Sequence, residues 1–200
     1  MWDEYIILNI ETTGLSPHSG GEICKVEALT IKNEFITEYF SSFISINNLM
    51  PTAVSSLIEI SNKQLKDAPS SIEVLSKLHY LIGSKVVISH NASFNKLFLD
   101  ASFEALGIQS NSKYFCTIKF AKAIFANEAI AGTMDSILQK LRIDERIALE
   151  KYCYFLNQHN YVDGDHIKRS TMRDVILIFA TFQELTRLMP SEFDFKEHFF

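Results

Sequence analysis

The chain starts with three consecutive segments of strand character, and helical spacing appears only after them. Tyr5 to Ile10 is a short apolar run that ends before Thr12-Thr13-Gly14. The segments Ile23 to Ile31 and Phe35 to Ile46 alternate apolar and polar residues between turn signals, as half-buried strands do. The sequence therefore predicts an antiparallel meander at its start, which restricts the chain to folds that contain a sheet.

Helices and one further strand are predicted for the rest of the chain. Val86-Val87-Ile88 is typical of a buried strand, and Phe94 to Leu106 carries apolar residues at helical spacing up to Gly107. Further helices are expected within residues 52–81, interrupted at Pro69, and over 117–125, 134–141, 147–156 and 172–188. This order indicates an α/β fold in which helices flank a mixed central sheet with its first three strands antiparallel.

The end of the first predicted strand carries a motif. Asn9-Ile10-Glu11-Thr12-Thr13-Gly14-Leu15 resembles the first motif of the DnaQ-like (DEDDh) 3′-to-5′ exonucleases, which reads Asp-x-Glu-Thr-Thr-Gly-Leu. That family lies in the RNase H-like superfamily and includes the epsilon proofreading subunit of bacterial DNA polymerase III. Residues 9 and 11 share one face of a strand, so two carboxylates there could share a pair of metal ions. Asn9 replaces the first of these carboxylates with an amide.

A second stretch resembles the family's His-Asn-Ala-x-Phe-Asp motif, which lies where a strand meets a helix. Here it reads Ser89-His90-Asn91-Ala92-Ser93-Phe94-Asn95, so the metal-binding Asp of the family is again replaced by its amide, Asn95. His90 and Asn91 also have a purely structural interpretation, since they could cap the helix that follows.

The third motif of the family is a His followed five positions later by an Asp, near the start of the last helix. Asp174 matches that Asp, and five positions before it stands Arg169. His166 lies three residues too early, and could replace the base only if the loop were shorter in space than in sequence. The resemblance implies one exonuclease-like domain over residues 1–188, with an insertion at about 144–165 and an aromatic tail over 189–200.

The three substitutions bear directly on the family's chemistry, in which two metal ions activate water and a His is the general base. Of four metal-binding carboxylates only Glu11 and Asp174 remain. At about 4 Å, with an effective dielectric constant near 20, each lost charge pair is worth roughly 4 kcal/mol. Glu11 and Asp174 should then bind metal weakly or not at all, and the Arg169 guanidinium cannot accept a proton. No cofactor is expected, unless residual activity uses Mg²⁺ or Mn²⁺.

Lys25 is a fourth departure, because Ile23-Cys24-Lys25-Val26-Glu27-Ala28 resembles the family's Ile-Ile-Glu-Ile-Gly-Ala strand. Two interpretations of Lys25 are open: a salt bridge beside Glu11 and Asp174, or a solvated surface cation. The resemblance also implies a residual pocket for the 3′ end of single-stranded DNA or RNA. Its candidate residues are Lys25, Thr12, Thr13, Gly14, Leu15, His90, Asn91 and Phe94. The two threonines could instead only hold the turn.

Three functions follow from these residues. The first is a non-catalytic accessory or scaffold protein on an exonuclease fold, docked on a polymerase or another complex of DNA replication, repair or nucleic acid processing. The second is an active or weakly active exonuclease. Its groups would be Glu11, Asp174, Asn9 and Asn95 around one metal ion, with His166 as base. The third is an engineered inactive mutant, because both amides are near-isosteric changes that disarm such a site, although Arg169 would be a superfluous third change.

Charge and the last residues favour a protein partner. The chain has 24 acidic and 19 basic residues, a net charge of -5, and so gives no overall attraction to phosphates. The tail after Pro190 carries Phe193, Phe195, Phe199 and Phe200. It could fold back on its own domain, but we expect it to contribute to association more than to stability.

The remaining features of composition concern the cellular compartment. The three scattered cysteines resemble neither a disulfide framework nor a zinc site. No apolar run is long enough to span a membrane, and the first residues lack the basic start of a signal peptide. The expectation is a soluble, cytoplasmic protein without a membrane partner.

Overall fold

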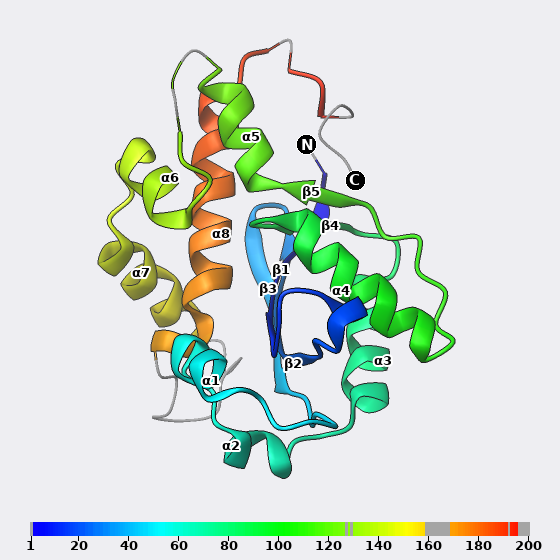
Figure 1. Cartoon of the computed structure of the whole chain (residues 1–200). Coiled ribbons are helices and arrows are strands. Elements are labelled where there is room, and N and C mark those ends of the chain that lie inside the picture. Colours follow the sequence, from blue (N-terminus) through cyan, green and yellow to red (C-terminus); the bar gives the residue numbers. More distant parts are fainter. Residues whose placement is uncertain (1, 127, 129, 159–168, 192, 196–200) are drawn as a thin grey trace.

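A five-stranded mixed sheet forms the centre of the computed structural model (Figure 1). The structure describes residues 2–126, 128, 130–158, 169–191 and 193–195, with the backbone alone for 153–158 and 169–171. The strands are β1 (Glu4–Thr12), β2 (Ile23–Lys32), β3 (Phe35–Phe43), β4 (Val86–Ser89) and β5 (Tyr114–Cys116), in the order β3-β2-β1-β4-β5. The first three strands pair antiparallel, and β4 and β5 run parallel to β1, which confirms the predicted α/β fold.

The helices follow the predicted order, with shifted ends. They are η1 (Pro17–Ser19), α1 (Thr52–Ile58), α2 (Asn62–Lys66), α3 (Ser71–Ile82), α4 (Ala92–Ala105), α5 (Thr117–Ile124), α6 (Met134–Leu141), α7 (Glu145–Gln158) and α8 (Arg169–Leu188). The largest shift is at α8, which begins at Arg169 rather than at residue 172. Gly107 adopts a left-handed conformation (φ 69°) just after α4, as the sequence indicated.

The two faces of the sheet carry separate cores, and the alternation of residues along β1 decides which side chain enters which core. Tyr5 and Ile7 pack with α5, α6, α7 and α8 on one face. Ile6 and Leu8 pack with α3 and α4 on the other face. Because side chains alternate along a strand, residues 9 and 11 point to the α8 face. The fold thereby brings the end of β1 against the start of the last helix.

The tail packs on the domain itself, close to the other end of the chain. The ring centroids of Trp2 and Phe195 are 5.2 Å apart, and those of Phe193 and Phe120 are 5.0 Å apart. Phe195 also lies 5.4 Å from Phe115, a fully buried ring of the core. Phe193 and Phe195 are half-buried against the hydrophobic core of their own domain, which favours the alternative that the tail folds back, while a role of the tail in association stays a prediction. Phe199 and Phe200 lie outside the described residues.

Two further expectations concern cysteines and membranes. Cys24 and Cys116 are buried free thiols, as predicted, while the side chain of Cys153 is outside the description. Among the described residues, no helix is both long and apolar enough to cross a membrane.

Candidate functional site

The turn after β1 is held by the two threonines of the first motif. The Thr12 hydroxyl donates to the carbonyl oxygen of Gly14 (2.8 Å), and the main-chain nitrogen of Glu22 donates to the Thr13 hydroxyl (2.9 Å). This is the structural role that the sequence left open for these residues. Leu15, the last residue of the first motif, is 90% exposed, so a large apolar side chain is open to solvent directly after this turn.

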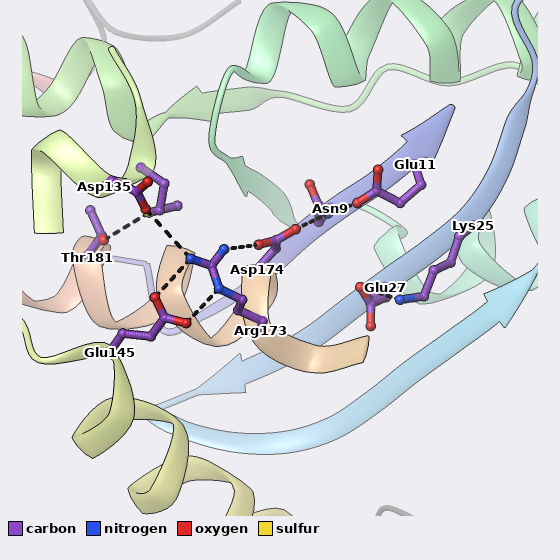
Figure 2. A network of polar contacts seen from close by, with 10 residues as sticks. Asn9, Glu11, Lys25, Glu27, Asp135, Glu145, Arg173, Asp174 and Thr181 are labelled. Atoms are coloured by element: carbon purple, nitrogen blue, oxygen red, sulfur yellow. Dashed lines mark hydrogen bonds and ion pairs between the residues drawn. The ribbon is translucent and has the colours of Figure 1, made fainter. Parts of the chain in front are cut away.

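Asn9 connects the two remaining motif carboxylates. Its side-chain nitrogen Nδ2 donates to Glu11 Oε1 and to Asp174 Oδ2, both at 3.3 Å (Figure 2). Asn9 and Glu11 project from the same face of β1, and Asp174 reaches them from α8. The structure thus brings these three predicted site residues together, and an amide donor stands between the two acids.

Lys25 lies in this site, and its partner differs from the expected one. Its ammonium is 3.0 Å from Glu27 Oε2, and the two side chains are only 7% and 4% exposed. In the antiparallel register Lys25 faces Glu11 and Glu27 faces Asn9, so all four side chains point to the α8 face. Tyr39 on β3 donates its hydroxyl to Glu27 Oε1 (3.2 Å). The interpretation of Lys25 as a solvated surface cation is wrong, because its side chain is buried and paired with Glu27. Its inclusion among substrate contacts stays a prediction.

Arg173 completes the network and was missed in the sequence. Its guanidinium makes a bidentate contact with Glu145, from Nε to Oε1 (2.7 Å) and from Nη2 to Oε2 (2.9 Å). Nη1 donates to Asp174 Oδ1 (3.1 Å), and Asp135 lies 3.6 Å from Nη2. Arg173 thereby connects the starts of α6 and α7 to α8, and it bonds to Oδ1 of Asp174, the oxygen that Asn9 does not contact (Figure 2).

The second motif lies at the junction of β4 and α4, with a different set of contacts. Asn95 is 3% exposed, and its Nδ2 lies 3.5 Å from the main-chain oxygen of Leu8, at the limit of a hydrogen bond. His90 Nδ1 is 3.0 Å from the Thr117 hydroxyl, and burial lowers the pKa of this His. Asn91 precedes α4 in a left-handed conformation and makes no side-chain capping bond, so the capping interpretation is wrong for Asn91.

The two residues considered for the position of the general base lie at or beyond the limit of the described residues. Arg169 is the first residue of α8, and its side chain is not described. His166 lies outside the described residues. Phe94 packs against Phe98, with ring centroids 4.9 Å apart, which makes it a partner of the α4 core. The roles of Arg169 and His166 therefore stay predictions from the sequence.

Burial and mutual repulsion set the charge state of the acids. Burial and Asp174 raise the pKa of Glu11 to about 7, against the lowering effect of Lys25 and Asn9. Burial also raises the pKa of Glu27 to about 7, although Lys25 and the Tyr39 hydrogen bond lower it. Burial thus makes both acids easier to protonate than an ordinary glutamate.

These contacts do not fit a pair of hard divalent cations. Mg²⁺ takes oxygen ligands at close range, whereas Asn9 presents its NH₂ group to both carboxylates. Arg173 occupies the other oxygen of Asp174, and Lys25 occupies Glu27. Over the described ranges, no group of three or more His, Cys, Asp or Glu residues is placed to hold a metal ion.

Replacing Glu11 by Gln should show how much the ionised Glu11 carboxylate lowers the free energy of unfolding at high pH. A carboxyl with a folded-state pKa of about 7, above its ordinary 4.5, loses stability as pH rises through that interval. Gln cannot ionise and can still accept the Asn9 hydrogen bond. We expect Glu11→Gln to match the wild type near pH 5 and to exceed it near pH 8 by on the order of 1–3 kcal/mol. Urea unfolding across this pH range measures the difference, and a pH-independent difference would contradict it.

Comparisons with known proteins agree with this architecture. The model of the family described as Exonuclease (RNase_T) matches residues 6–147. DNA polymerase III PolC-type of Halalkalibacterium halodurans is 25% identical over 174 residues, which cover 86% of this chain and 12% of that polymerase. The same enzyme of Staphylococcus saprophyticus is 32% identical over 108 residues, 54% of this chain and 7% of the polymerase. The chain thus spans about a tenth of the length of these relatives.

Solved structures show the same fold at low identity. The nuclease domain of 3′hExo, a DEDDh family member bound to rAMP, superimposes with a TM-score of 0.69 at 17% identity, covering 93% of this chain and 92% of that domain. Exonuclease X in complex with 5′ overhanging duplex DNA gives a TM-score of 0.65 at 15% identity, over 97% and 96% of the two chains.

Proposed function

Because this chain belongs to the RNase_T exonuclease family, in its DnaQ-like branch, we propose that it is a member which has lost two-metal catalysis and serves as a non-catalytic accessory domain. The observation that carries this proposal is the position of the Asn9 amide between Glu11 and Asp174. A hydrogen-bond donor satisfies the two acids where a cation would otherwise have to neutralise them. The site is therefore complete without a metal ion.

The charge balance supports the same reading. Two metal ions bring about four positive charges, which protein sites neutralise with carboxylates. Here Asp174 is shared with Arg173, and Glu27 is shared with Lys25. The sequence adds Arg169 at the position of the general base, and a guanidinium does not deprotonate in proteins. Both metal binding and proton transfer thus lack the groups they require.

The proposed accessory role rests on the polymerase relatives and on the first-motif turn, which is still present in this chain. The relatives named above are DNA polymerases, and one structural neighbour was solved with DNA. The turn of the first motif and the exposed Leu15 are still present, so a pocket for the 3′ end of single-stranded DNA or RNA is part of the proposal. The net charge of -5 favours reaching nucleic acid through a protein complex, such as a polymerase, over binding it alone.

A nuclease assay tests the proposal. We expect no shortening of 5′-labelled single-stranded DNA or RNA with Mg²⁺ or Mn²⁺, because ligand charge and general base are both missing. The triple variant Asn9→Asp, Asn95→Asp, Arg169→His restores three family residues and should gain Mn²⁺-dependent shortening. Its matched control carries Glu11→Ala in addition and should stay inactive.

The opposite result would favour the second function. Stepwise shortening by the wild type, abolished by Glu11→Ala, would show a working exonuclease that uses Glu11, Asp174, Asn9 and Asn95 around one metal ion. Comparing the wild type with His166→Ala would then decide whether His166 is its base. An inactive wild type with an active triple variant supports the loss of catalysis.

A further inference from the structure

An open cavity of about 440 Å³ lies between the loop after β3 and the short helix α2. Two lysines of α2 line it, Lys63 and Lys66, and its other walls are uncharged: Ser45, Ile46, Asn47, Asn48, Leu49, Asn62 and Leu65. Both lysines are exposed, and within the part of the chain that the structure describes neither forms an ion pair. The lining therefore carries two positive charges and no negative one, in a chain whose net charge is -5.

The cavity lies at the same end of the sheet as the first motif. β1 ends at Thr12, the antiparallel strand β2 begins at Ile23, and β3, antiparallel to β2, ends at Phe43. The main-chain nitrogen of Ile44 donates to the carbonyl oxygen of Cys24 (2.9 Å), which extends the pairing up to the loop. This loop therefore leaves the sheet beside the turn of the first motif.

Glu22 connects the motif turn to the wall of the cavity. The Thr13 nitrogen donates to the Glu22 carbonyl oxygen (2.9 Å), and the Glu22 nitrogen donates to the Thr13 hydroxyl (2.9 Å). The Glu22 carboxylate accepts from the main-chain nitrogens of Asn47 (3.0 Å) and Asn48 (3.2 Å), and from Asn47 Nδ2 (2.7 Å). These bonds satisfy the carboxylate within the protein and fix the cavity wall to the turn.

Asn62 fixes α2 against the same loop. Its Oδ1 accepts from the main-chain nitrogen of Met50 (2.8 Å), and its Nδ2 donates to the Met50 carbonyl oxygen (3.0 Å). A capping box closes the start of α2. Lys63 and Lys66 therefore project from a support that hydrogen bonds connect to the motif turn, as a binding site requires.

We propose that this cavity binds a backbone phosphate of a single-stranded nucleic acid whose 3′ end lies at the turn of the first motif, with Lys63 and Lys66 contacting the phosphate. The inference rests on the proposed pocket for a 3′ end and adds a second point of contact for the same strand. The lysine ammonium is a common phosphate ligand. Leu49, 84% exposed, adds an apolar side chain on which a base can pack.

Two lysines give an acidic chain a local means of contacting nucleic acid. Each ammonium that neutralises a phosphate releases counterions from the strand, so binding weakens as salt rises. For single strands, the slope of log K against log salt is about -0.7 per contact. Lys63 and Lys66 should together contribute about twice this value, and they should position the strand without selecting a sequence.

Fluorescence anisotropy of a 5′-labelled oligothymidylate tests the proposal. The strand has roughly 12 nucleotides, and the buffer contains EDTA so that no metal-dependent cleavage occurs. The wild type should bind near 50 mM salt and lose affinity as salt rises. The double variant Lys63→Gln, Lys66→Gln should bind roughly tenfold more weakly, with a salt slope smaller by about 1–1.5.

Two matched double variants separate a phosphate contact from a general effect of charge. Lys63→Arg, Lys66→Arg keeps both cations and should retain the affinity. Lys32→Gln, Lys122→Gln removes two exposed lysines from β2 and α5, and should change the affinity less than about twofold because distant charges are screened. All these positions are exposed, so the melting temperatures should stay within about 1–2 °C of the wild type.

Competition identifies the source of the phosphate. Unlabelled oligothymidylate should displace the labelled strand. An oligoglutamate peptide of equal charge, and inorganic phosphate at the same ionic strength, should compete much more weakly, because neither presents a 3′ end to the motif turn. Equal competition by either of them overturns the assignment to a nucleic acid strand.

Three further results would overturn the inference: a wild type that does not bind the strand at low salt, a Lys63→Gln, Lys66→Gln variant that binds as the wild type does, or an equal loss in the Lys32→Gln, Lys122→Gln control. None of them bears on the nuclease assay with metal ions. A wild type that shortens oligonucleotides overturns the proposed function and leaves the binding result in EDTA intact, so the two failures are distinguishable.

Discussion

Asn9→Asp should make the stability of this protein depend on divalent cations. The substitution replaces a donor that bonds to Glu11 and Asp174 by a third acid in contact with both. Like charges about 4 Å apart repel by roughly 4 kcal/mol at an effective dielectric constant of 20, and protonation relieves part of this. We expect a net loss of about 3–5 kcal/mol in EDTA near pH 8, a fall in melting temperature of roughly 10 °C for a chain of this length.

Metal ions and acid should both restore the Asn9→Asp variant. Millimolar Mn²⁺ should recover a large part of the lost melting temperature, because a third carboxylate adds both ligand and charge. Near pH 5 the deficit should shrink, since a shared proton then replaces the amide hydrogen. Asn111→Asp, at an exposed position, is the matched control and should shift the melting temperature by no more than about 1–2 °C. Equal stability of Asn9→Asp and wild type in EDTA would contradict the position of this amide.

Removing the two tail rings should destabilise the domain without changing its association. Phe193 and Phe195 pack on Trp2, Phe115 and Phe120. Truncating a buried Phe to Ala costs about 3–5 kcal/mol, and these rings are partly buried. The double variant Phe193→Ala, Phe195→Ala should therefore lose about 3–5 kcal/mol in total, or roughly 10 °C in melting temperature.

The control for the tail is a Phe outside the core. Phe35 is 66% exposed, so Phe35→Ala should change the free energy of unfolding by less than about 1 kcal/mol. Light scattering of wild type and double variant measures association directly and should give the same mass. A double variant that keeps its melting temperature but has a lower molar mass than the wild type would support the expectation that the tail serves association.

Local periodicity made most of the fold predictable. The alternation along β1 puts residues 9 and 11 on one face of the strand, whereas the sequence left two interpretations of Lys25 open and its burial beside them needed the β1–β2 register. Gly107 marked the end of α4 for the same local reason. The start of α8 was harder, because Ser170 and Thr171 are weak helix formers and the packing of the whole helix overrides their preference.

The contacts of the site depended on tertiary structure and were less predictable. Arg173 reaches Glu145 only because α7 and α8 lie side by side, and the two residues are 28 positions apart. The position of Glu27 could have been predicted. Lys25 and Glu27 are two residues apart on one strand, so they share a face, and Glu27 pairs with Asn9 on the neighbouring strand. The partial burial of Phe195 could not be predicted from the sequence, because its neighbour Trp2 lies at the other end of the chain.

Because Trp2 packs against Phe195, the first and last described segments of the domain lie at the same place on its surface. The first and last described segments lie side by side (Figure 1), and their rings are 5.2 Å apart. A longer polypeptide could enter and leave the domain at that point, so the domain could be inserted into a surface loop of a host with only short linkers. Joining the two ends and opening the chain at an exposed turn would likewise keep the sheet order, which makes the fold a suitable scaffold for circular permutation.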